Sequence, residues 1–382
     1  MIDINKLKDE IIELADAKKE DFEKISLYIH SNPELAFKEY KAQKVLTDYL
    51  EENGFKVNRG ICNLETSFEA IYENGEGKDI AFLAEYDALP EIDHACGHNL
   101  IGTSSMGAGV VLKEIMEKYD IKGRLRVVGT PAEENGSGKV LMIKEGYFKD
   151  IDAALLMHPT NKSIPDDISY SAVNIEYEFT GKSAHAAANP GGGINALSSL
   201  ILMFNALDSQ RLHFKDYSRV HGIILKGGTV DNVITEKALG RFNIRALNYD
   251  DLLKIIEVVN RCAEGAALAT GTKVKIEQKG QIRKEVKNNK KIVNYVRNNM
   301  DYIGEEYIER TMEQGLGSTD MGNVTHEIPA IQFYIGLEEN AKTHTPEFEV
   351  ASGNEYGKRN LNASVKVLGM SGLDIFLSKE EL

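Results

Sequence analysis

An alternation of strand-like and helix-like segments between residues 79 and 157 constrains this 382-residue chain more than any other feature. The pattern predicts strands at 79–84, 124–129 and 153–157, with helices at 100–118 and 138–147 between them. Strands that alternate with helices are typical of an α/β fold with a largely parallel sheet. In such sheets the loops at the carboxyl ends of the strands carry the chemistry, so we expect functional residues there.

A different pattern begins near residue 169. After a long alternating strand, a Gly-rich turn and an apolar helix, it predicts strands at 219–226 and 237–246, a helix at 249–270 and a strand at 272–278. This β-α-β-β-α-β order is that of a ferredoxin-like unit.

The chain is also longer than a single core usually grows, which favours two domains. We expect a catalytic α/β domain at 1–168 and 280–382, with a mixed, mostly parallel sheet flanked by helices. An inserted ferredoxin-like α+β domain is expected at 169–279.

Composition and charge exclude several classes of partner. The chain carries 45 Lys and Arg against 59 Asp and Glu, a formal net charge of −14 that repels nucleic acids and anionic membranes. Its 3 cysteines lack the spacing of a disulfide framework. No signal peptide and no apolar run near the ~20 residues of a membrane span are recognised. We therefore expect a cytoplasmic protein with no nucleic-acid or membrane partner.

The stretch "EIDHACGHNL" places Cys96 between His94 and His98. Cys-x-His is too short for a zinc-finger knuckle, and a lone cysteine here is more often a buried structural residue. Three further groups follow predicted strands or precede the last predicted helix, at 351–369: Glu133 with Glu134, His158, and His344. Thiolate, imidazole and carboxylate together suit zinc or a similar divalent ion. A glutamate beside a ligand can also take a proton from a metal-activated water.

Six segments resemble the aminoacylase/carboxypeptidase family of di-metal amidohydrolases, and in particular its p-aminobenzoyl-glutamate hydrolase and aminoacylase-1-like-2 dipeptidase branch. They are "AEYDALPEIDHACGHNLIG", "GTPAEENGSGKV", "LLMHP", "GKSAHAAANPGGGINAL", "GGTVDNVI" and "GSTDMGNVTHEIPAI". The resemblance runs from about residue 25 to about residue 370. It implies hydrolysis of the amide bond of N-acyl amino acids or dipeptides, with two divalent ions per chain, zinc or manganese.

The same resemblance implies roles for individual residues. Cys96 is similar to the thiolate that bridges the two metals, with His98 and His158 completing one site and Glu134 and His344 the other. Glu133 corresponds to the general base, and Asp87 to a carboxylate that supports the site from outside the ligand shell. Glu85 stands where distant relatives place a histidine ligand.

Two residues of the inserted domain are also implied. His185 in "GKSAHAA" matches a histidine that relatives lend across a dimer interface to polarise the scissile carbonyl, and Asn232 in "GGTVDNVI" matches a residue that binds the substrate carboxylate or amide. The resemblance therefore implies a homodimer formed through the inserted domain. It also implies that the loop 317–326 lines the substrate pocket, although a structural loop is an alternative.

Two other functions remain open from the residues. A cysteine amidase would use Cys96 as nucleophile with His94 or His98 as base, but it leaves Glu134, His158 and His344 unexplained. A non-catalytic relative or structural zinc protein would bind metal without turning over any amide.

Overall fold

The computed structural model describes residues 3–338 and 340–382. The chain divides into two compact units. The first unit consists of Met1–Ile168 together with Val286–Leu382, and the second unit is Ser169–Glu285. Each unit has its own hydrophobic core. Among the described residues, no helix is long and apolar enough to cross a membrane.

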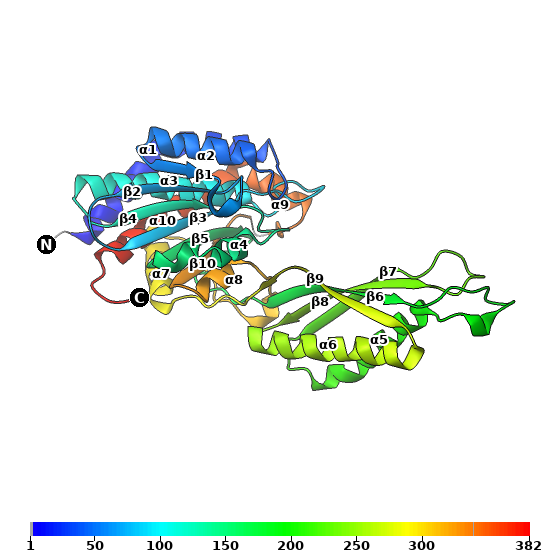
Figure 1. Cartoon of the computed structure of the whole chain (residues 1–382). Helices are drawn as coiled ribbons and strands as arrows, with labels where there is room; N and C mark the ends of the chain where they lie inside the picture. Colours follow the sequence, from blue (N-terminus) through cyan, green and yellow to red (C-terminus); the bar gives the residue numbers. More distant parts are fainter. Residues whose placement is uncertain (1–2, 339) are drawn as a thin grey trace. The chain divides into compact units, whose positions relative to one another are not determined.

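The first unit is built on a 6-stranded sheet in the order β1-β2-β4-β3-β5-β10 (Figure 1). The strands are β1 (Lys56–Arg59), β2 (Phe68–Glu73), β3 (Asp79–Ala84), β4 (Arg124–Gly129), β5 (Ala153–Thr160) and β10 (Ala330–Gly336). Strands β4, β3, β5 and β10 run parallel to one another, whereas β1 and β2 pair antiparallel at one side. The prediction of a mixed, mostly parallel sheet is confirmed.

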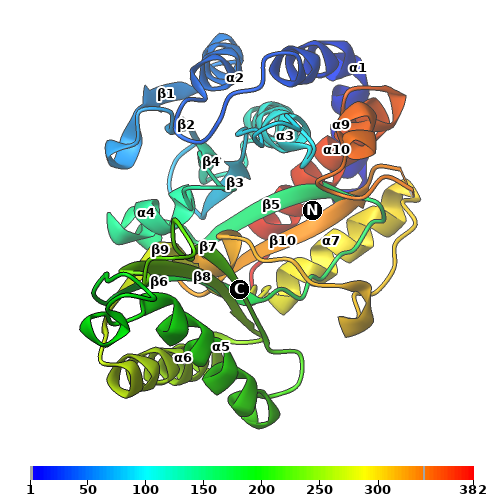
Figure 2. The same ribbon diagram turned by 90° about the vertical axis from the view of Figure 1, so that its right-hand side faces the viewer.

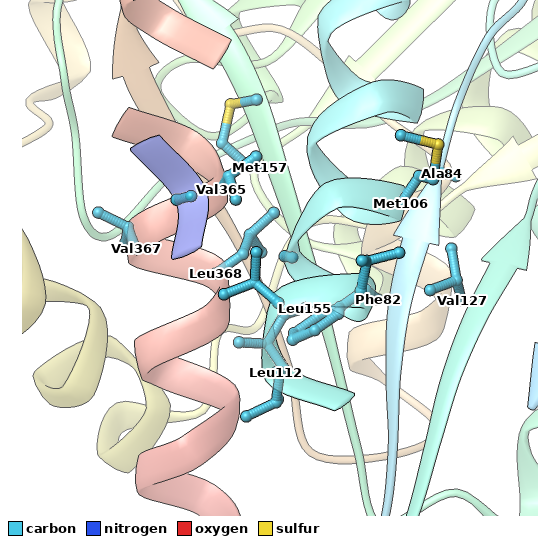
Figure 3. Packing of buried hydrophobic residues seen from close by; sticks show 14 of the residues in the cluster. Phe82, Ala84, Met106, Leu112, Val127, Leu155, Met157, Val365, Val367 and Leu368 are labelled. Atoms are coloured by element: carbon cyan, nitrogen blue, oxygen red, sulfur yellow. The ribbon is translucent and has the colours of Figure 1, made fainter. Parts of the chain in front are cut away.

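Helices cover both faces of this sheet, which explains why β3 is apolar along its whole length. On one face lie α1 (Ile4–His30), α2 (Tyr40–Glu52), α3 (His98–Lys118), α7 (Lys290–Ile303), α9 (Pro346–Ser352) and α10 (Glu355–Leu377). The other face is covered by the short helices α4 (Gly138–Lys144) and α8 (Met321–Thr325). Phe82 of β3 packs with Leu112 of α3 and Leu368 of α10 in the larger core (Figure 3), while Leu83 points to the opposite layer.

The second unit is a 4-stranded antiparallel sheet in the order β7-β8-β6-β9. Its elements are β6 (Ser171–Thr180), α5 (Ala196–Gln210), β7 (Arg219–Lys226), β8 (Lys237–Ala246), α6 (Tyr249–Thr270) and β9 (Lys273–Arg283). Both helices pack on the sheet, since α5 and α6 share one apolar core with β6 and β8. This is the ferredoxin-like arrangement expected from the order of the elements.

Several elements differ from the sequence-based expectation. Helix α4 ends at Lys144 rather than at the predicted residue 147. Strand β5 continues beyond 157 to Thr160, because it keeps pairing with β10 (Figure 2), so His158 lies within the strand rather than after it. The last predicted helix, 351–369, is divided into α9 and α10, and the Asn354 side chain caps the start of α10. Strand β9 extends to Arg283, past residue 280, where we expected the chain to leave the inserted domain.

Candidate metal centre

Cys96 lies in a tight turn immediately before α3. Gly97 follows it with φ 74°, in the left-handed region that favours glycine. A Cβ at Gly97 would stand 2.5 Å from Pro159 Cγ, so glycine also allows the turn to approach β5 closely. His158 precedes Pro159 on that strand, and its Nε2 lies 3.4 Å from Cys96 Sγ. The local sequence Cys-Gly-His therefore brings a thiol against an imidazole from another strand.

The predicted ligands form three overlapping groups in the first unit. One group consists of Cys96, His98 and His158, and a second of Cys96, Glu134 and His344. The third group, His98, Glu133 and Glu134, includes the predicted base. Within each group the potential ligand atoms lie within 4.8 Å of one another. Two donors bound to one zinc ion at about 2.0–2.3 Å are separated by at most about 4.6 Å. The distances of 3.4 Å between Cys96 Sγ and His158 Nε2 and 3.3 Å between His344 Nε2 and Glu134 Oε1 are short enough for a shared ion. Cys96 belongs to the first two groups, and His98 and Glu134 each connect one of these to the third.

The backbone around His344 is held in a costly conformation. This residue has φ 65°, which is uncommon outside glycine, and its N–H donates to the Ala95 carbonyl oxygen at 2.8 Å. That bond fixes His344 beside the turn that carries Cys96. Its Nε2 lies 3.3 Å from Glu134 Oε1. Backbone strain of this kind persists where the surrounding structure holds it, often at functional sites.

Asp87 connects two of the segments that carry potential ligands. Its Oδ1 accepts from His98 Nδ1 at 3.0 Å, and its Oδ2 accepts from the Glu134 backbone N–H at 3.0 Å. With Nδ1 committed to Asp87, His98 presents Nε2 to the cluster. That atom is buried, lacks a hydrogen-bond partner among the described residues, and lies 3.6 Å from Glu85 Oε2 and 4.0 Å from Glu134 Oε1. A buried imidazole nitrogen in this setting fits a metal ligand.

The protonation states of two candidate ligands also suit metal binding. Burial works against the charge of Glu134, but the hydrogen bond from His344 and the charge of His98 lower the pKa of Glu134 to about 2. Burial lowers the pKa of His158 to about 3, so its imidazole is neutral near pH 7. A carboxylate and a neutral imidazole are the forms that bind metals.

Cys96 has a different electrostatic setting. Burial raises the pKa of its thiol well above the usual range, and the neighbouring Glu134 raises it further. A nucleophilic cysteine needs the opposite, a lowered pKa in an electropositive environment. A metal ion, in contrast, deprotonates a thiol that coordinates it. The environment therefore favours Cys96 as a metal ligand over Cys96 as a nucleophile.

A buried ion-pair network that we did not predict from the sequence adjoins the cluster. Lys139 is fully buried in the first turn of α4. Its Nζ contacts Glu85 Oε1 and lies 2.7 Å from Asp320 Oδ1. Its backbone N–H donates to Asp320 Oδ2 at 3.0 Å. Asp320 comes from the segment 317–326, which the resemblance placed at the substrate pocket. The position of Lys139 could have indicated this network, because a cation in the first turn of a helix is unfavourable unless nearby anions compensate its charge.

Replacing Lys139 with Met should destabilise the protein, because it leaves the Glu85 and Asp320 carboxylates buried without their cation. We expect a loss of about 3–5 kcal/mol in the free energy of unfolding, measured by urea denaturation. Lys144→Met at the exposed end of the same helix is the control and should change the free energy by less than about 0.5 kcal/mol. Equal effects of the two substitutions would contradict a structural role for the network.

His185 and Asn232 lie in the second unit, where they are close to each other. His185 forms a bridge with Val233, and the Ala186 N–H donates to the Asn232 carbonyl oxygen at 2.9 Å. Both residues are exposed. His185 Nδ1 accepts from the backbone N–H groups of Ala187 and Ala188 at 3.2 and 3.1 Å. Since Nδ1 is an acceptor, the neutral ring carries its proton on Nε2, which is then a donor.

Cys96→Ser should lower the metal content of the purified protein, because Cys96 contributes to two of the donor groups and a serine hydroxyl is a much poorer metal ligand than a thiolate. We expect the number of bound divalent ions per chain, measured by elemental analysis after reconstitution and desalting, to fall by at least about half. Cys62→Ser, outside the three groups, should bind as much metal as the unmodified protein. An unchanged metal content in Cys96→Ser would remove Cys96 from the site.

Comparison with known proteins gives consistent matches along the chain. The model of "Peptidase family M20/M25/M40" matches residues 81–359. The Xaa-Arg dipeptidase of Mus musculus is 33% identical over 384 residues, covering 97% of this chain and 89% of the relative. One of the subunits of the p-aminobenzoyl-glutamate hydrolase of Escherichia coli (strain K12) is 32% identical over 380 residues, covering 94% and 74%. The crystal structure of the Bacillus subtilis YXEP protein, a "dinuclear metal binding peptidase from M20 family", superposes with a TM-score of 0.69 at 22% identity over 92% of this chain and 99% of that one.

Proposed function

Because this chain belongs to peptidase family M20/M25/M40 and is a hydrolase of amide or peptide bonds, we propose that it cleaves N-acyl amino acids or dipeptides with two divalent metal ions. The ions, zinc or manganese, would be held by Cys96, His98 and His158 and by Cys96, Glu134 and His344. The observation that carries this proposal is the thiol of Cys96, which belongs to two of the three donor groups and is shared between them. The substrates are p-aminobenzoyl-glutamate-like compounds or short dipeptides, as the names of the two relatives suggest.

The side chains of this unit have distinct tasks in the proposed reaction. Bound divalent ions supply Lewis acidity, which makes water more acidic and the amide carbonyl more electrophilic. Glu133, next to Glu134, takes a proton from the attacking water and passes it to the leaving amine. Asp87 holds His98 through Nδ1 and holds the loop of Glu133 through the Glu134 amide. These contacts keep the base and the ligands in place without reorganisation during the reaction.

Glu133→Gln tests the role of the base. The amide cannot accept the proton, so we expect kcat on p-aminobenzoyl-glutamate or a panel of Xaa-Arg dipeptides to fall at least about a hundredfold. The number of bound ions should remain that of the unmodified protein, because two donor groups, Cys96 with His98 and His158 and Cys96 with Glu134 and His344, form without Glu133. Near-normal turnover would defeat this assignment.

Chelation separates the proposal from its alternatives. A di-metal hydrolase loses activity with a chelator and regains it when zinc or manganese is added back, whereas a cysteine amidase is indifferent to both treatments. A non-catalytic relative binds metal and turns over none of the substrates. Thiol alkylation alone does not discriminate, since it also blocks a metal-bound Cys96.

We also propose a homodimer in which the second unit supplies His185 to the site of the partner chain. The Nε2–H of His185 then donates to the carbonyl oxygen of the substrate, where negative charge develops. Support comes from β7, the edge strand of the second sheet, whose residues Ile223, Ile224 and Leu225 are 47%, 46% and 42% exposed. An exposed apolar edge strand is a natural place for pairing with another chain.

Mixing two inactive variants tests this sharing. If His185 acts across the dimer, a heterodimer of His185→Ala and Glu133→Gln has one complete site, with Glu133 from the first chain and His185 from the second. Random assembly after co-expression should restore about a quarter of the unmodified activity. His185→Ala expressed alone is the control and should remain inactive. If the heterodimer is also inactive, His185 does not act across the dimer.

A further inference from the structure

The carboxylate of Glu39, at the N-terminus of α2, is completely buried, and none of the steps described above uses it. Its Oε1 accepts from the Phe37 N–H at 3.0 Å and from the Ala132 N–H at 2.9 Å. Its Oε2 accepts from Thr66 Oγ1 at 2.6 Å. Both oxygens are therefore engaged, and one of them contacts the loop that follows β4.

Burying this acid is unfavourable. Burial raises the pKa of Glu39 to about 7, even though Thr66 and the backbone N–H groups stabilise its charge. An apolar side chain of similar size would fill the same space without this cost. The use of a carboxylate therefore indicates that its hydrogen bonds, rather than its volume, matter here.

The amide that Glu39 holds belongs to a strained residue. Ala132 is buried and has φ 61°, in the left-handed region that non-glycine residues rarely adopt. Its carbonyl oxygen accepts from the N–H groups of Gly136 and Ser137 at 2.9 and 2.7 Å, which closes the loop. A buried non-glycine residue keeps such a conformation only where neighbouring groups hold it, and Glu39 binds its N–H.

Glu133 directly follows Ala132, and a backbone N–H group on either side of it is anchored. The Ala132 N–H is bound to Glu39 on one side, and the Glu134 N–H is bound to Asp87 at 3.0 Å on the other. Two buried carboxylates therefore hold the backbone of the residues before and after Glu133. The direction in which its carboxylate leaves the loop depends on the left-handed turn at Ala132.

We propose that Glu39 is a positioning residue for the general base, because it holds the Ala132 amide in the left-handed turn that directs Glu133 toward the attacking water. This inference rests on the proposed role of Glu133. Glu39 itself is not a member of the donor groups found among the described residues. It acts on the rate of the chemical step and leaves the groups that bind metal and substrate undisturbed.

The test compares Glu39→Asp with Glu39→Gln. Aspartate keeps the charge but is one carbon–carbon bond shorter, so it cannot reach both Ala132 and Thr66. We expect kcat to fall by about 10- to 100-fold, because a displacement of about 1 Å at a reacting group has effects of this size. KM and the number of bound ions per chain, measured by elemental analysis, should remain within about twofold of the unmodified values.

Glutamine has the length of glutamate and can still accept from the Ala132 amide, while its NH₂ donates to the Thr66 hydroxyl, which can act as an acceptor. Glu39→Gln should therefore keep kcat within about threefold of the unmodified value. Thr66→Val is the matched control, because it removes a hydrogen bond from the same buried carboxylate but not the bond to Ala132. It should lower the melting temperature and leave kcat nearly unchanged.

Two results would overturn the inference: normal kcat in Glu39→Asp, or a kcat loss matched by an equal loss of bound metal. The second would mean that Glu39 supports the fold of the whole cluster rather than the base. Glu133→Gln is assayed alongside. If Glu133→Gln is inactive while Glu39→Asp has normal kcat, only the positioning role fails. If Glu133→Gln itself retains turnover, the proposed function fails first.

Discussion

The candidate site depends on the two hydrogen bonds of Asp87. This buried carboxylate follows β3 and binds the imidazole of His98 through one oxygen and the backbone of Glu134 through the other. It thereby joins the loop after β3 to the loop after β4, and each of these loops carries candidate metal donors. Burial opposes its charge, yet the charge and hydrogen bond of His98 keep the pKa of Asp87 below its usual value. Without Asp87, both the direction of His98 Nε2 and the position of Glu134 would be undetermined.

The loop between β4 and α4 shows how such a site is kept rigid. Glu39 binds the backbone of the loop at Ala132, and Asp87 binds it at Glu134. At the start of the helix, Lys139 pairs with Glu85 and Asp320. All three anchors are buried and involve charged groups, which are costly to remove from water unless they are paired. A hydrolase benefits from these buried charged groups, although burying them costs free energy, because a base and metal ligands that are already in place need no reorganisation during the reaction.

Much of the fold was predictable, because the spacing of apolar residues along a segment reflects which of its faces are buried. The uninterrupted apolar strand at 79–84 indicated a sheet covered on both faces, and helices do cover both. The order of elements after residue 169 was sufficient for the ferredoxin-like arrangement. The boundaries near His158 and Gly353 were less predictable, because strand pairing with β10 and side-chain capping by Asn354 decide where those elements end.

By itself, the sequence determined the α/β class, the loops that carry chemistry and, through family motifs, the residues now found in the donor groups. Only the tertiary structure decided which side chains hold those residues in place. Glu39 and Ala132 are 93 positions apart, and Lys139 and Asp320 are 181 apart. No periodic pattern links such pairs, because their contact depends on strand order and on how the loops return across the sheet. Short sequence motifs therefore identify the candidate residues of the site. Its rigidity comes from buried charged groups that contact one another only in the folded chain.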